Sequence, residues 1–251
     1  MRKLLAFTVP VMLAAATLAA LGDRRDILAH FARFHVSAVE VRGARYLDAE
    51  EIRQWIPVYE DERGGARSLE GRLRTHRLIE EATVRSLPGD TAEIVIRERQ
   101  PVALVATPAL NPVDPAGEYL PIDPALHRLD LPILRPMEPP GGTLTVTEHQ
   151  QIQAMAAELH RLGELHPDFA RSVSEIAWTP QGTLTARFSE TGAALHFQPP
   201  LSVRRLREGL AALADAVPRA PERTVTVADL RFSDQVVVRH ASPGEQGNAR
   251  R

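Results

Sequence analysis

The chain has 251 residues, of which 44% are hydrophobic and 25% are charged, and it contains no cysteine. This length suits one large or two modest globular domains. A formal net charge of −2 excludes the broad basic surface of a nucleic-acid-binding protein, so no nucleic acid is expected as a partner. The absence of cysteine excludes disulfides, a thiol nucleophile and a thiolate metal site.

The N-terminal segment Leu4–Gly22 is apolar and free of charge, with Arg2 and Lys3 before it and charged residues directly after it. A helix of nineteen residues is about 28 Å long, close to the hydrocarbon thickness of a bilayer. The segment is therefore predicted to enter the membrane, as part of a cytoplasmic stub and transmembrane segment over residues 1–25. A retained anchor and a cleaved signal peptide stay open as alternatives, and both place the rest of the chain outside the cytoplasm. The flanking positive charges favour a cytoplasmic N-terminus.

A short membrane-proximal helix is expected at residues 26–35, followed by a small α+β domain at residues 36–101. Alternating apolar residues predict a first strand that ends at Gly43. Two short helices should follow, the first capped by Asp48 and the second by Ser68.

Two more alternating segments, Ala82–Leu87 and Ala92–Arg97, are joined by Pro88, Gly89 and Asp90. Proline, glycine and aspartate in succession favour a hairpin turn. The predicted order of this domain is strand–helix–helix–strand–strand.

Residues 102–240 are expected to form a mixed α/β domain with an antiparallel-rich sheet. Strands are predicted at Val102–Ala106, Tyr119–Ile122, Val173–Trp178, Thr183–Phe188, Ala193–Phe197, Thr224–Leu230 and Gln235–Arg239. One helix should begin at a capping box of Thr147 and Gln150, and another at Ser202. The polar tail at residues 241–251 is expected to be disordered.

Candidate catalytic and metal-binding residues all have simpler interpretations. His160 and His166 are six residues apart and match no metal-ligand spacing. His127 lacks a serine nucleophile in a Gly-x-Ser-x-Gly context. Asp114 and Asp123 stand beside prolines, where aspartate commonly stabilises turns. The sequence therefore predicts no catalytic residue, metal site, cofactor or small-molecule substrate, and it favours a binding function.

Several segments, in order along essentially the whole chain, resemble the FtsQ/DivIB family of bacterial cell-division proteins. Those that carry the resemblance are Val39–Gly43, Tyr46–Ile52, Ile79–Gly89, Ile94–Ala103, Asp114–Tyr119, Leu131–Leu134 and Asp229–Arg239. The first four are similar to a POTRA domain, and the last is similar to the closing signature of the family.

The resemblance implies a single-pass protein of the inner membrane, with a POTRA domain and an FtsQ-type β-domain in the periplasm. It also favours retention of the N-terminal segment as an anchor. Proteins of this family are non-enzymatic scaffolds of the divisome that bind FtsB and FtsL and help to recruit septal cell-wall synthesis. The alternative is a secreted or transporter-associated periplasmic POTRA chaperone.

The last strand, placed at Phe232–Arg239, is hypothesised to present a free edge to a strand of an FtsB- or FtsL-type partner. It is rich in valine and precedes a polar tail rather than a covering element, and a free hydrophobic edge is a liability unless a partner uses it. The predicted partner-binding residues are Phe232, Ser233, Asp234, Gln235, Val236, Val237, Val238 and Arg239. The alternative is that this strand only completes the core.

Overall fold

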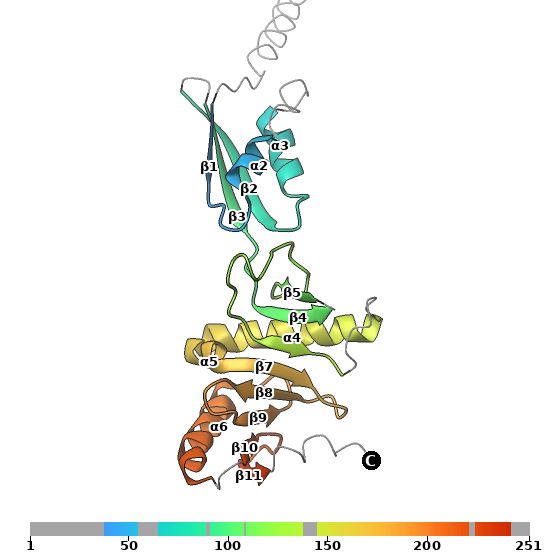
Figure 1. Cartoon of the computed structure of the whole chain (residues 1–251), viewed down its shortest axis with the longest axis vertical. Coiled ribbons are helices and arrows are strands. Elements are labelled where there is room, and N and C mark those ends of the chain that lie inside the picture. Colours follow the sequence, from blue (N-terminus) through green and yellow to red (C-terminus); the bar gives the residue numbers. More distant parts are fainter. Residues whose placement is uncertain are drawn as a thin grey trace, which may run out of the picture. The chain divides into compact units, whose positions relative to one another are not determined.

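The computed structural model describes residues 38–54, 65–88, 91–107, 109–137, 145–220 and 224–241. The chain folds into two compact units that divide between Glu98 and Arg99 (Figure 1). The predicted membrane segment, the linker helix at 26–35 and residues 242–251 of the predicted tail lie outside these ranges. The tail was predicted from residue 241, but Ala241 belongs to a strand. Within the described ranges, no helix is both long enough and apolar enough to cross a membrane.

The first unit is a three-stranded sheet with two helices. Its elements are β1 (Ala38–Arg42), α2 (Ala49–Gln54), α3 (Gly65–Leu73), β2 (Ile79–Leu87) and β3 (Thr91–Glu98). The spatial order is β1-β3-β2, in which β3 is antiparallel to β2 and parallel to β1. The predicted order of strands and helices is confirmed, and so is the hairpin of β2 and β3.

The helix starts of this unit agree with the sequence in one case and differ in the other. The carboxylate of Asp48 accepts a hydrogen bond of 2.8 Å from the backbone N–H of Glu50, as expected of a cap. The cap predicted at Ser68 is wrong, because α3 already begins at Gly65. Ala66 packs against the same hydrophobic cluster that contains Leu69, so the buried face of the helix extends one turn further back than the sequence pattern indicated.

The core of this unit forms where the helices cover one face of the sheet. Residues of both helices and alternate residues of the strands are buried there, namely Ile52, Leu69, Leu73, Ile79, Ala82, Val84, Ile94 and Ile96. Burial alternates from Ile94 to Glu98 in β3 because successive side chains of a strand point to opposite faces.

A buried carboxylate at the end of β3 fixes the turn that follows β1. Glu98 is 2% exposed. Its Oε1 accepts hydrogen bonds from the backbone N–H groups of Arg45 (3.0 Å) and Leu47 (2.9 Å), and its Oε2 accepts one from Tyr46 (2.9 Å). Three main-chain donors of the turn are thus satisfied by one side chain.

We expect Glu98→Gln to lower the free energy of unfolding by about 2 kcal/mol, because the substitution removes a charged acceptor and turns an amide donor towards main-chain N–H groups. Urea unfolding followed by far-UV circular dichroism measures this change. Glu81→Gln is the matched control, since Glu81 is exposed on the neighbouring strand and pairs with the exposed Arg97; its expected effect is about 0.5 kcal/mol or less. Equal effects of the two substitutions would refute the role of Glu98.

The second unit is built on an eight-stranded sheet. Its strands are β4 (Ala103–Thr107), β5 (Ala109–Val113), β6 (Ile133–Arg135), β7 (Val173–Trp178), β8 (Leu184–Phe188), β9 (Ala194–Phe197), β10 (Val225–Asp229) and β11 (Val237–Ala241). They lie in the order β11-β10-β9-β8-β7-β6-β4-β5. Four of the seven pairings are antiparallel and three are parallel, so the sheet is mixed.

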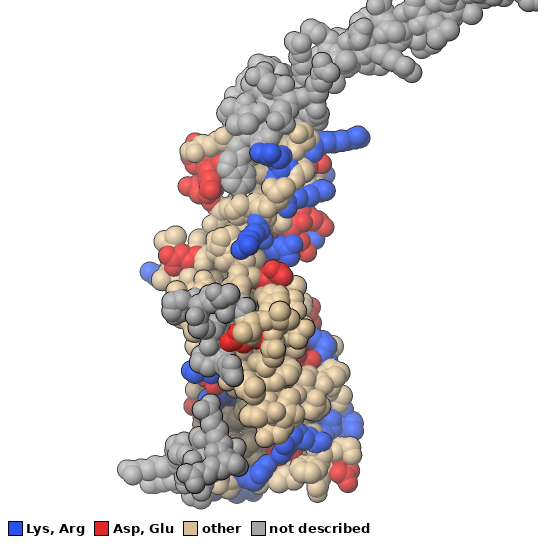
Figure 2. Space-filling model, turned by 90° about the vertical axis from the view of Figure 1, so that its right-hand side faces the viewer, with Lys and Arg blue, Asp and Glu red and all other residues tan. Residues whose placement is uncertain are grey.

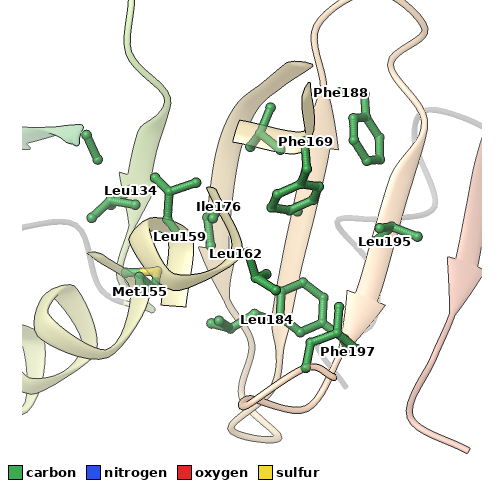
Figure 3. Close-up of a cluster of buried hydrophobic side chains, with 14 of the residues drawn as sticks. Leu134, Met155, Leu159, Leu162, Phe169, Ile176, Leu184, Phe188, Leu195 and Phe197 are labelled. Carbon is green, nitrogen blue, oxygen red and sulfur yellow. The ribbon is translucent and has the colours of Figure 1, made fainter. Parts of the chain in front are cut away.

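Three α-helices accompany this sheet: α4 (Val146–Leu165), α5 (Pro167–Ser172) and α6 (Val203–Ala216), the last continued by a 3-10 turn at Val217–Arg219. Helix α4 packs on β6 and β7, and α6 packs on β10 and β11. Figure 3 shows Leu159 and Leu162 of α4 pointing towards the strand residues Ile176 and Leu184. The rings of Phe169 and Phe188 meet edge to face, with centroids 6.0 Å apart.

Three sequence predictions for the second unit need correction. The capping box is formed by Thr145 and Glu148 instead of Thr147 and Gln150. Tyr119–Ile122 is not a strand, because only Tyr119 makes an isolated bridge, to Val113. Strand β5, which contains Pro112, was not predicted; proline is tolerated there because β5 lies at the edge of the sheet.

Candidate functional site

The final strand lies at an edge of the eight-stranded sheet (Figure 1, red). It pairs antiparallel with β10, from Val225 opposite Ala241 to Asp229 opposite Val237. No second neighbour of β11 occurs among residues 38–241 as far as the structure describes them. An edge strand of this kind carries a row of main-chain N–H and C=O groups that can pair with another chain.

The predicted partner-binding residues divide between this strand and the loop before it. Val237, Val238 and Arg239 belong to β11, which continues to Ala241. The residues from Phe232 to Val236 precede the strand, so the prediction of a strand over Phe232–Arg239 is wrong for that part. Val236 and Val238 both pack against the hydrophobic core.

A buried ion cluster joins the end of β10 to β11. Asp229 is fully buried. Its Oδ1 accepts a hydrogen bond of 2.9 Å from Nε of Arg231, and its Oδ2 accepts bonds of 2.7 Å from Nη2 of Arg231 and 2.6 Å from Nη2 of Arg239. The backbone N–H of Arg231 also donates to Oδ1. One carboxylate therefore fixes both the turn after β10 and a side chain in the middle of β11.

The ionisation of Asp229 reflects two opposing effects. Burial of the carboxylate raises its pKa, whereas the hydrogen bonds and the positive charge of Arg231 lower it. The second effect is the stronger, and the pKa falls from 3.8 to about 2. Asp229 is consequently a charged group at neutral pH, and it is held by two arginines.

A neutral histidine lies beside this cluster on β9. His196 pairs with Asp229 in the register of β9 and β10, and its Nε2 is 2.6 Å from Oγ1 of Thr183. Burial lowers the pKa of His196, and the charge of Arg231 lowers it further. Thr183 is only 4% exposed, so its hydroxyl is enclosed and this contact has the geometry of a structural network rather than of an accessible nucleophile.

The comparisons with known proteins agree with the segments quoted from the sequence. No family model matches the chain. The chain is 29% identical to the "Cell division protein FtsQ" of Rhodothermus marinus over 232 residues, which cover 85% of this chain and 81% of the relative. The matched share is larger than either unit alone, so it includes residues of both. This similarity supports the resemblance to the FtsQ/DivIB family.

The aspartates and histidines singled out in the sequence mostly bind the local main chain. Asp114 accepts hydrogen bonds from the N–H groups of Ala116 and Glu118, and Asp123 accepts from Ala125 and Leu126. His166 caps α5 through its Nδ1. These roles in turns and caps are the ones expected from the sequence.

His160 and Asp130 come together in an open groove of about 500 Å³, which Glu164 and Arg171 also line. Within the parts of the chain that the structure describes, no three His, Asp or Glu residues form a group that could hold a metal ion. On the face shown in Figure 2, basic and acidic side chains are interspersed. The edge of β11 is therefore the best-defined candidate site in the described part of the chain.

Sequence reasoning missed two residues that shape this site. Asp229 was quoted only as part of the closing signature of the FtsQ/DivIB family, and Arg205 was not singled out at all. An aspartate followed two residues later by an arginine gives no sign that the carboxylate will be buried. Arg205 looks like any polar position of an amphipathic helix, because its neighbour Arg204 has the same chemistry.

Proposed function

We propose that this chain is a non-enzymatic scaffold of bacterial cell division. In this proposal, Leu4–Gly22 anchors it in the inner membrane with the N-terminus in the cytoplasm. Residues 36–101 form a periplasmic POTRA domain, and residues 102–240 form an FtsQ-type β-domain. The resemblance to the FtsQ/DivIB family and the name of the similar Rhodothermus marinus protein support the division role. The apolar N-terminal segment supports the anchor.

The scaffold acts by binding division proteins of the FtsB and FtsL type, which in turn bring septal cell-wall synthesis to the site. The contact is made by strand addition to β11. The observation that carries this proposal is the position of β11 at the edge of the sheet, with β10 on one side. Strand addition draws its affinity from main-chain hydrogen bonds and its specificity from alternate side chains.

The side chains around β11 suit such a partner. Val236 and Val238 are partly buried and pack against the core, so the edge is held against the body of the unit. Phe232 is 44% exposed, although most large apolar side chains of this unit are buried. The side chain of Arg239 is 57% exposed even while it binds Asp229. Phe232 and Arg239 are therefore available beside the edge for a partner to contact.

Proline substitutions at Val237 and Val238 test this proposal with an internal control. In an edge strand, adjacent residues direct their N–H groups to opposite sides, so one substitution removes a donor towards β10 and the other removes a donor towards the open edge. We expect the outward substitution to abolish co-purification with the extracytoplasmic region of an FtsB-type partner while the circular dichroism spectrum and melting temperature are kept. The inward substitution should lower the melting temperature as well.

Ala109→Pro is the matched control, because Ala109 begins β5 at the opposite edge of the same sheet, where proline is tolerated. This variant should bind the partner as the unmodified chain does. Full partner binding by both the Val237 and the Val238 variants would exclude β11 as the docking edge.

A further inference from the structure

A buried arginine of α6 contacts the loop that leads into β11. Arg205 is 8% exposed. Its Nη2 donates to the carbonyl oxygens of Phe232 (2.6 Å) and Gln235 (2.8 Å), with a longer contact of 3.4 Å to that of Leu230. Its Nη1 is 2.5 Å from Oε2 of Glu208, one turn further along the helix. The guanidinium thus joins α6 to both ends of the loop.

The two close carbonyls lie on either side of Ser233 and Asp234, which form the bend of the loop. Holding both of them fixes where the bend ends and hence where the chain becomes extended. Val236, directly after the second carbonyl, then packs against the core, and β11 starts at Val237. A planar guanidinium presents several donors in a fixed fork, which a lysine ammonium does not reproduce.

The contact between the Arg205 guanidinium and the loop carbonyls is costly to break. A buried guanidinium is costly unless its donors are paired, and hydrogen bonds to a charged group are stronger than those between neutral groups. If the loop moved away, Arg205 would keep Glu208 but would lose its main-chain acceptors inside the unit. The loop conformation with Arg205 bound is therefore favoured over released ones.

The preceding residue offers a natural comparison. Arg204 also pairs with Glu208, at 2.6 Å, but its side chain is 72% exposed, against 10% for Arg205. Both residues are arginines, both lie in α6, and both pair with Glu208. They differ in that Arg205 contacts the loop. Comparing substitutions at the two positions therefore distinguishes the effect of this contact from the effects of helix stability and of charge.

We propose that Arg205 is the positioning residue of the β11 edge: by holding the carbonyls of Phe232 and Gln235, it keeps β11 in register with β10 and ready for a second strand. The proposal rests on the proposed function in that β11 is the edge a partner uses. It adds that the ability of β11 to pair with a partner strand depends on Arg205 of α6, a residue outside the edge itself.

Hydrogen exchange on the full chain in detergent, read by mass spectrometry, tests the proposal with Arg205→Met, Arg205→Lys and Arg204→Met. We expect exchange of the β11 amides to become about tenfold to a hundredfold faster in Arg205→Met, from the loss of hydrogen bonds to a charged group. Arg205→Lys should restore this protection only in part. Exchange in β7, β8 and β9 should stay unchanged, and Arg204→Met should match the unmodified chain throughout.

Affinity for the extracytoplasmic region of an FtsB-type partner is the second readout, and it should fall with the loss of protection in β11. Unchanged β11 exchange in both Arg205 variants overturns the proposal. Equally faster exchange across the whole second unit in both also overturns it, since Arg205 would then be a general packing residue. Faster β11 exchange with unchanged affinity supports positioning by Arg205 and instead overturns the proposed use of the β11 edge.

Discussion

Gly43→Ala is expected to destabilise the first unit by about 4 kcal/mol, the sum of a left-handed backbone and a steric clash. Gly43 follows β1 with φ of +85°, and a Cβ at this position would lie 2.0 Å from the backbone carbonyl oxygen of Ile96 in β3. A main-chain atom in a paired strand has little freedom to move. The turn that Glu98 holds would therefore have to separate from β3. Urea unfolding of the full chain, followed by circular dichroism, measures the loss.

Gly192→Ala distinguishes the cost of the left-handed backbone from the cost of the steric clash. Gly192 also has a positive φ, +65°, but no atom lies within 4 Å of the position its Cβ would take. This substitution should cost only the backbone preference, about 1–2 kcal/mol. A similar loss in the two variants would show that the close approach of β1 and β3 contributes nothing.

Asp229→Asn is expected to lower the free energy of unfolding by about 3 kcal/mol, because it removes the only carboxylate that Arg231 and Arg239 are seen to bind in the described part of the chain. The change in shape is minimal, so the loss reports on charge and hydrogen bonding. Asp215→Asn is the control: Asp215 is exposed and pairs with the exposed Arg219, so its removal should cost about 0.5 kcal/mol or less. Urea unfolding at pH 7 compares them.

The same variant predicts a pH dependence with a definite sign. The pKa of Asp229 falls from 3.8 to about 2 on folding, so its ionised form stabilises the native state at any pH above the unfolded value. That contribution, about 2.5 kcal/mol, should be lost as the pH falls from about 4 to about 2. The difference in unfolding free energy between the unmodified chain and Asp229→Asn should shrink over this range. A constant difference would contradict the lowered pKa.

The contacts around β11 also suggest how an edge strand can stay accessible to a partner without pairing with unwanted chains. An exposed edge can pair with unwanted chains. Here Val238 is packed into the core, Arg239 is bound to Asp229, and the preceding loop is held by Arg205. The edge is therefore fixed in one conformation, which lowers the entropy that a partner strand has to overcome on binding.

Local pattern predicted many of the elements because their cause is local. Val173–Trp178 was predicted with the bounds of β7, and Ser202 caps α6 as expected. Alternation along a strand and a hydroxyl before an amphipathic helix depend on neighbouring residues only. The family resemblance added the expected function, and the similarity to the Rhodothermus marinus protein supports a role in cell division.

Elements whose existence depends on distant partners were missed or displaced. Strand β5 contains Pro112, which resembles a loop residue in sequence, yet pairing with β4 makes it an edge strand. The last strand starts at Val237 instead of Phe232, and the loop before it is bound through the carbonyls of Phe232 and Gln235 by Arg205, in a helix more than twenty residues earlier. A run of valines shows that a strand is near but does not show where it begins.

The sequence by itself determined the mixed α+β character, most strands, the starts of α2 and α6, the family resemblance, and a candidate site near the C-terminus. Only the tertiary structure decided which strands lie at the edges, that Asp229 is buried between two arginines, and that Arg205 rather than Arg204 faces the loop. The physical reason is the range of the interactions. Periodicity and capping act within a few residues, whereas strand order and buried ion contacts join residues that are adjacent only after folding.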